Sequence, residues 1–232
     1  MPRVLNSTPS RFWRRGRVPW IAGAAVLIVW MGVVAPLLSA GEWQQWTFQE
    51  DPTSEPPRGW EVLSGAWEVR AAANGGNRVL AQVGPPLPGL DLPAILAPMP
   101  PVRDLRATVR LKPVGVGAFK TMGLIIRWRD AGTLTILRVD GTPGRVWLER
   151  LQGGERSLRA GYIVPLYPDR WNTVRVTARG DWLNLFLNGV FLGGVREDDP
   201  VPGRIGLMAG PGGRVLLDDL EVELTGRADT LR

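Results

Sequence analysis

Short runs of alternating hydrophobic and polar residues follow one another after residue 41, with Gly, Pro, Asp and Asn between them. Alternation with a period of two is typical of a β-strand that has one buried face. No stretch of this region keeps the 3.6-residue period of an amphipathic helix. The pattern therefore predicts an all-β sandwich or barrel. Strands are expected near residues 43–49, 59–63, 66–72, 78–83, 93–97, 103–112, 120–129, 132–140, 144–151, 160–164, 171–179, 182–187, 189–194, 203–209 and 213–224.

The clearest hairpins lie in residues 171–192. Two alternating runs are joined by the turn at 179–181, and Asn188-Gly189 joins the second run to a third. Asn-Gly favours a type I′ turn, because both residues tolerate positive φ and the twist of this turn matches that of the strands. The stretch predicts a three-strand meander.

The last expected strand, Val215–Leu224, changes the parity of its apolar residues at Asp218-Asp219. Because side chains alternate between the two faces of a strand, both apolar sets reach the core only if one extra residue is inserted. We therefore predict a β-bulge at Asp218 or Asp219. The proline-rich segment 85–101 is expected to form an edge strand or a surface crossover, since proline cannot donate a ladder hydrogen bond.

A different pattern, one continuous apolar run, occupies Val18–Ser39. As a helix this run would span about 30 Å, the thickness of a bilayer core. Five arginines and no acids precede it, and such positive flanks stay on the cytoplasmic side. We expect a basic cytoplasmic tail at 1–17, a transmembrane signal anchor at 18–40 and a sandwich domain at 41–232. The protein would then be a single-pass protein of the cell membrane, with its domain extracellular or periplasmic.

A cleaved signal peptide is the alternative interpretation of the same run. The apolar stretch of such a peptide is usually about 7–15 residues long, with small residues before the cut. The run here is longer, and the best cleavage site, after Ala40, has the bulky Leu38 at its −3 position. These features favour the uncleaved anchor.

Composition removes several classes of function. The net charge of +6 comes almost entirely from the five N-terminal arginines, so the domain itself does not call for a nucleic-acid partner. The chain contains no Cys and no His. This absence excludes disulfides, Ser-His-Asp triads, Cys nucleophiles and zinc sites built on His or Cys. Any catalysis would have to use Asp, Glu, Tyr, Lys or Arg.

An ordered set of short motifs spans residues 43–224: PRGWEV and GAWEV at 57–69, GLIIRWRD at 123–130, WN at 171–172, LNG at 187–189, GRIGL at 203–207 and LDDLEV at 217–222. In this order they resemble the concanavalin A-like lectin/glucanase superfamily, especially laminin G-like domains and the 3-keto-disaccharide hydrolase-type domain. The resemblance implies a jelly-roll β-sandwich. It implies no single function, because this fold hosts lectin-like modules, glycosidases and adhesion domains.

The acidic residues offer little catalytic chemistry. Glucanases of this superfamily carry Glu-x-Asp-x-Glu on one strand, and retaining hydrolysis needs two carboxyls about 5–5.5 Å apart. The nearest equivalent here, residues 219–223, is interpreted as the solvated face of the last strand. Some relatives bind calcium through Asp side chains, which makes Asp218 and Asp219 candidate ligands, as is the acidic loop 197–199. Their spacing matches no dedicated calcium loop.

Sugar binding needs aromatic faces for stacking and charged or amide groups for hydroxyls. Trp147 lies on a predicted central strand with Glu149, next to strands that carry Arg127 and Arg138. Side chains of like parity on adjacent strands form one patch. We expect Arg127, Arg138, Trp147 and Glu149 to bind a ligand, and Trp128 to be buried on the other face. Three further tryptophans are assigned to the core: Trp60, Trp67 and Trp171.

The favoured function is a membrane-anchored, extracytoplasmic, non-catalytic binding module for carbohydrate or a cell-surface glycan. One alternative is a structural or accessory subunit of a membrane protein complex. A second alternative is a glycoside hydrolase-like enzyme that uses carboxylates alone. A glycan site needs an exposed Trp beside polar groups, whereas a subunit interface needs a broad apolar patch.

The predicted anchor can be tested by topology. Protease added outside intact cells should release the sandwich domain from the membrane, because the domain lies outside and the anchor stays in the bilayer. The release is measured by fractionation and immunoblotting. A mature protein whose N-terminal sequence begins at Gly41 would instead establish a cleaved signal peptide.

Overall fold

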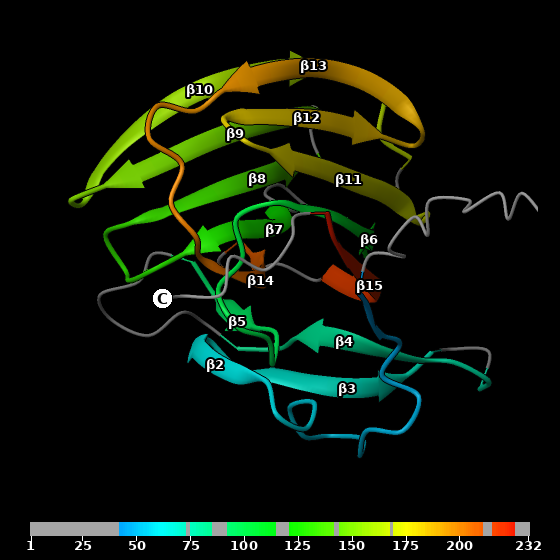
Figure 1. Cartoon of the computed structure of the whole chain (residues 1–232). Helices are drawn as coiled ribbons and strands as arrows, with labels where there is room; N and C mark the ends of the chain where they lie inside the picture. Colours follow the sequence, from blue (N-terminus) through cyan, green and yellow to red (C-terminus); the bar gives the residue numbers. More distant parts are fainter. Residues whose placement is uncertain are drawn as a thin grey trace, which may run out of the picture. The chain divides into compact units, whose positions relative to one another are not determined.

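Two antiparallel β-sheets face each other in the computed structural model (Figure 1). The structure describes residues 42–72, 75–84, 92–114, 121–141, 144–167, 169–210 and 215–225. Within those ranges no helix is long and apolar enough to cross a membrane. The predicted tail and anchor, residues 1–17 and 18–40, lie outside the described residues.

The first sheet, sheet A, has eight strands. Its strand order is β13 (Val190–Arg196), β12 (Trp182–Leu187), β11 (Asn172–Arg179), β6 (Leu105–Pro113), β15 (Val215–Leu224), β4 (Arg78–Gln82) and β3 (Trp67–Ala71), and β1 (Trp43–Trp46) pairs with β15. The order confirms the predicted meander of β11, β12 and β13.

Sheet B has seven strands. Its strand order is β10 (Glu155–Ile163), β9 (Arg145–Gln152), β8 (Leu134–Asp140), β7 (Thr121–Trp128), β14 (Arg204–Ala209), β5 (Ala94–Leu96) and β2 (Glu61–Ser64). The edge strands β10 and β13 of the two sheets contact each other at one end of the sandwich (Figure 1). Each predicted strand is present, so the sandwich expected from the alternation is confirmed.

The core lies between the sheets and consists of the inward-facing residues of both. Trp60 and Trp67 are buried in it, as predicted, and Trp60 packs against Phe48 with 5.6 Å between ring centroids. Trp171 departs from the prediction, because it is only half-buried and lies 4.8 Å from the guanidinium carbon of Arg110. Trp171 therefore lies at the rim of the core, where its ring contacts the charged side chain of Arg110.

Both local irregularities that the sequence predicts are present. Asn188 and Gly189 have φ values of 49° and 81°, the positive values that a type I′ turn requires. The register of β15 shifts between Asp218 and Glu221, where Asp219 has a φ of 49°. This β-bulge lets Leu217 and Leu220 both reach the core.

The proline-rich segment is arranged differently from the prediction. Ala94–Leu96 forms β5, which lies between β14 and β2 inside sheet B and not at its edge. Pro93 and Pro98 flank this strand without entering it. A three-residue strand fits between two prolines because neither proline has to donate a ladder hydrogen bond.

Gly189 provides a direct test of the turn. Gly189→Val places a β-branched residue at positive φ, which should lower the free energy of unfolding by about 1–3 kcal/mol. Gly76→Val is the matched control: a Cβ at either glycine meets no atom within 4 Å, but only Gly189 has positive φ. The control should change stability by less than about 0.5 kcal/mol. Equal urea denaturation midpoints for the two variants would contradict the turn assignment.

Candidate ligand-binding face of sheet B

The outer face of sheet B brings together three of the four residues expected to bind a ligand. In the regular pairing of β8 with β9, Arg138 lies opposite Trp147, and Glu149 is two residues further along β9. Their neighbours Val139 and Leu148 are buried in the core between the sheets. Alternation therefore places Arg138, Trp147 and Glu149 on the side away from the core.

Charged contacts fix the geometry of this patch. Arg138 lies between two carboxylates, with Nη1 3.1 Å from Oε1 of Glu149 and Nε 3.4 Å from Oδ1 of Asp140. The indole Nε1–H of Trp147 donates to Oδ2 of Asp140 over 2.7 Å. Arg145 also lies near this ring, with its guanidinium carbon 5.5 Å from the ring centroid. A planar aromatic group is thus held in one orientation among cations and anions.

Gly161 on β10 leaves room for this indole. Gly161 lies opposite Trp147 in the sheet. A Cβ at position 161 would stand 2.8 Å from Cζ3 and 2.9 Å from Cε3 of the tryptophan. Trp147 is half-buried, so part of its ring faces solvent.

Arg127 does not join the patch, contrary to the expectation from parity. The register of β7 against β14 shifts, so that Arg204 pairs with Trp128 and Gly206 pairs with Ile125, leaving one extra residue in β7. Arg127 is 4% exposed and forms an ion pair with the equally buried Glu197. Burial lowers the pKa of Arg127, and the charge of Glu197 opposes that effect. Arg127 is thus part of a buried pair away from the ligand face.

The polar surroundings of Glu197 complete this buried pair. The hydroxyl of Thr135 donates to Oε1 of Glu197 over 2.9 Å, and Nη2 of Arg127 donates to the carbonyl of Arg103 over 3.1 Å. Glu197, one of the acids of the loop considered for calcium, therefore joins the loop after β13 to sheet B. Removal of either side chain would lower the stability of the fold, because the charge of the other would stay buried and unpaired.

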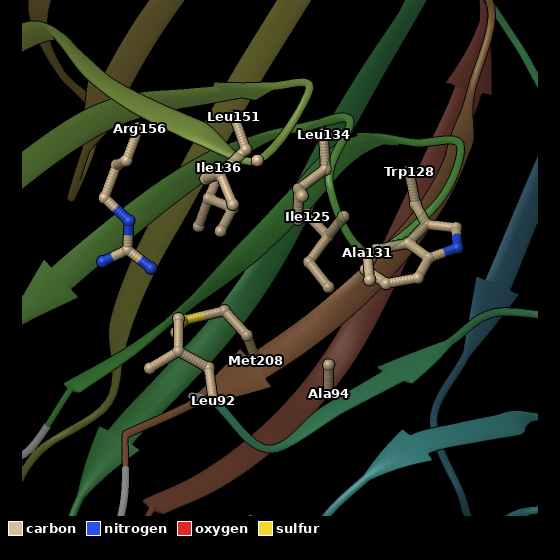
Figure 2. Close-up of a pocket in the computed structure, with 11 residues that line it drawn as sticks. Leu92, Ala94, Ile125, Trp128, Ala131, Leu134, Ile136, Leu151, Arg156 and Met208 are labelled. Atoms are coloured by element: carbon tan, nitrogen blue, oxygen red, sulfur yellow. The ribbon is translucent and has the colours of Figure 1, made fainter. Parts of the chain in front are cut away.

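Trp128 is also placed differently from the prediction. The same β-bulge turns it to the outer face of sheet B, where it lines a pocket of about 250 Å³. Figure 2 shows Trp128 and Arg156 at opposite ends of this pocket. Between them the lining is mainly apolar and includes Ile125, Leu134, Ile136, Leu151 and Met208. Sequence reasoning missed the pocket, because these residues are the types that also fill a core.

The two candidate calcium ligands are occupied by contacts within the chain. Asp218 is buried, and its two carboxylate oxygens accept hydrogen bonds from Asn77 Nδ2 and from the backbone N–H of Asp219. Asp219 pairs with Arg110, with 2.6 Å between Nη1 and Oδ2. Calcium needs six to eight oxygen ligands, and no group of three or more acidic residues suited to a metal occurs in the part of the chain that the structure describes. Calcium binding here stays a prediction.

The acidic face of β15 is engaged in the same way. Besides Asp219 with Arg110, Glu221 accepts a hydrogen bond from Gln45, and Glu223 lies 3.2 Å from Arg106. Basic or amide side chains of β1 and β6 therefore face each acid of this strand. This is the arrangement of an amphipathic strand whose outer face is solvated.

Known proteins resemble this domain in fold only. No protein-family model matches the chain, and no curated protein matches it. Carbohydrate-binding module CBM66 from Bacillus subtilis has a TM-score of 0.59 at 16% identity, over 75% of this chain and 99% of the module. Domain 4 of AbnA, a GH43 extracellular arabinanase from Geobacillus stearothermophilus solved with arabinotriose, has a TM-score of 0.54 at 10% identity, over 80% and 93% of the two chains. The Crh5 transglycosylase has a TM-score of 0.56 at 14% identity, over 81% and 86%.

These likenesses define the class of fold. The domain is a jelly-roll β-sandwich, the fold that it shares with CBM66, with domain 4 of AbnA and with the Crh5 transglycosylase. The concanavalin A-like architecture expected from the motifs agrees with this result. The narrower resemblance to laminin G-like and 3-keto-disaccharide hydrolase-type domains stays a prediction.

Asp218 and Asp181 predict opposite effects of pH on stability. Burial raises the pKa of Asp218, whereas the hydrogen bond from Arg196 lowers the pKa of Asp181. Because the folded-state pKa of Asp218 is raised, the stability that this group contributes falls as pH rises from about 4, the unfolded pKa, through the folded pKa. Because the folded-state pKa of Asp181 is lowered, the stability that this group contributes is lost as pH falls from about 4 through the folded pKa. From pH 3 to 7, the stability of the wild type relative to Asp218→Asn should fall, and that relative to Asp181→Asn should rise. Urea denaturation at several pH values measures both differences, and differences of the same sign would contradict this account.

Proposed function

We propose that this domain is a non-catalytic carbohydrate-binding module that uses the outer face of sheet B. Arg138, Trp147 and Glu149 form its binding patch, with Asp140 holding the tryptophan. The observation that carries the proposal is the fixed, half-exposed indole of Trp147 in contact with Asp140 and two arginines. A flat apolar ring stacks on the face of a sugar, and charged groups beside it bind hydroxyls.

The fold supports this proposal without establishing it. CBM66 is named as a carbohydrate-binding module, and the domain of AbnA was solved with arabinotriose. Sandwiches of this type host other functions as well, so the argument for this chain depends on its own patch. A ligand of the patch should carry hydroxyls, because Arg138 can donate hydrogen bonds to them and Glu149 can accept hydrogen bonds from them beside the tryptophan.

A binding role fits the charges of the patch better than hydrolysis. Asp140 and Glu149 both contact Arg138, so a cation separates the two carboxylates of the face. A glycosidase needs one carboxyl with a raised pKa as its acid and a second one free to attack or to activate water. In the patch both carboxylates are already engaged by Arg138, so neither is free to attack or to activate water.

The predicted anchor gives this module a place in the cell. An uncleaved helix at 18–40 would hold the module at the outer surface of the membrane. The ligand would then be a glycan of the envelope or of the surroundings, captured next to the bilayer. This part of the proposal rests on the sequence pattern of Val18–Ser39 and on its basic flank.

One observation favours the alternative of an accessory subunit. Val190 and Phe191, on the edge strand β13, are 63% and 56% exposed, and Phe191 packs on Phe186 with 5.2 Å between ring centroids. Exposed apolar groups on an edge strand can form part of a protein interface. In that case Phe191→Ser would remove a partner that co-purifies with the full chain.

Glycan-array binding of the full chain in detergent tests the proposed function. Trp147→Ala should abolish binding, since it removes the aromatic face on which the sugar stacks. Gly161→Val should weaken binding by displacing the same ring. Trp182→Ala is the matched control, because Trp182 is 48% exposed on a strand of sheet A. A blank array for the wild type, or equal losses for Trp147→Ala and Trp182→Ala, would reject the assigned patch.

A further inference from the structure

One part of the outer face of sheet B is apolar, although that face points away from the core. The outward-facing Ala94, Leu96, Ile125, Ile136 and Met208 form a second hydrophobic cluster with Leu134, separate from the main core. Outer faces of sandwich sheets normally carry polar residues, because they meet water. Sheet B thus has buried apolar residues on both of its faces, and β7 is buried on both sides from Met122 to Arg127.

The pocket at this second cluster is large enough for a ligand. Its volume of about 250 Å³ exceeds the roughly 150 Å³ of an apolar cavity that accepts benzene. Trp128 closes one end, and Ala131 of the following turn lies beside it (Figure 2). An apolar cavity holds no stable water without polar partners. The lining therefore suits an aliphatic chain or a ring of similar size.

Arg156 gives the pocket a positive end. Among the described residues that line the pocket it is the only charged one, and its side chain is 41% exposed. Its nearest described carboxylate is Glu149, 3.9 Å away, and Glu149 lies closer to Arg138, at 3.1 Å. The charge of Arg156 is thus only loosely paired within the described residues. An anionic group at this end of the pocket would complement it.

We propose that this pocket binds an aliphatic carboxylate, with the hydrocarbon chain among Ile125, Leu134 and Ile136 and the carboxylate at Arg156. The hydrocarbon chain would leave water for an apolar lining, and each buried methylene group would contribute about 0.8 kcal/mol. A guanidinium and a carboxylate form charge-assisted hydrogen bonds, which select an acid over a neutral lipid of equal length. This site is distinct from the sugar-binding patch and does not depend on that patch binding a glycan.

Photo-crosslinking tests this site in the full chain. The probe is an eight-carbon carboxylic acid with a terminal diazirine, and the matched neutral probe is the corresponding alcohol. After irradiation of the chain in an amphipathic polymer, mass spectrometry locates the labelled peptides. The wild type should be labelled by both probes within 125–136, around 151 or at 208, and octanoate should compete. Because labelling is read by position, probe that partitions around the apolar N-terminal segment does not interfere.

Three variants separate the parts of the proposal. Arg156→Gln should reduce labelling by the acid on the order of tenfold and leave labelling by the alcohol unchanged. Arg159→Gln, a second arginine of β10 that pairs with Asp198, should change neither. Ala131→Phe should abolish labelling by both probes, since its ring would occupy the pocket, and an unchanged thermal transition confirms its fold.

Two results would overturn the proposal. Equal labelling of the wild type and Arg156→Gln by the acid would show that the pocket does not recognise a carboxylate. No labelling of the pocket in the wild type would show that something else, such as a segment of a partner protein, covers the apolar face. Neither result bears on the glycan array, whose readout depends on Trp147, so the two proposals can fail separately.

Discussion

One extra residue in β7 determines what each face of sheet B presents. Without it, the alternation that places Ile125 outside would place Arg127 outside and Trp128 in the core. With the β-bulge, Arg127 leaves the ligand face for a buried pair with Glu197, and Trp128 closes the end of the outer pocket. The pairs in β8 and β9 stay regular, which keeps Arg138 opposite Trp147. The patch and the pocket therefore share one surface.

The β-bulges of β15 and β7 show what the sequence could and could not predict. In β15 the apolar residues change parity at Asp218-Asp219, so the pattern itself requires an extra residue. In β7 the run Leu124-Ile125-Ile126 is apolar at both parities, because both faces are buried. The hydrophobic pattern of such a run is the same whether or not the strand contains a bulge. The first bulge was predictable for this reason, and the second, which moves Arg127 and Trp128, was not.

A similar limit applies to the candidate site. Arg138, Trp147 and Glu149 lie in a regular hairpin, so parity alone places them together correctly. The ring orientation of Trp147 depends on Asp140 and on the missing side chain of Gly161, which are tertiary contacts. The start of β10 at Glu155 was also missed, because the segment 155–159 is exposed and shows no apolar alternation. Whether a strand forms can be predicted from the local hydrophobic pattern, whereas the geometry of a side chain depends on its neighbours on adjacent strands.

The charges of the outer face distinguish the two sites proposed on it. Arg138 is held between two carboxylates, and these contacts balance its charge. Arg145 approaches the indole of Trp147, and Arg156 lies at the mouth of the pocket with Glu149 only at 3.9 Å. Glu149 thus lies between Arg138 of the patch and Arg156 of the pocket, and it is closer to Arg138. Because a cation whose partner is distant gains most from an incoming anion, Arg156 is the group that favours an acid in the proposed pocket, whereas the paired charges beside Trp147 suit the hydroxyls of the proposed glycan.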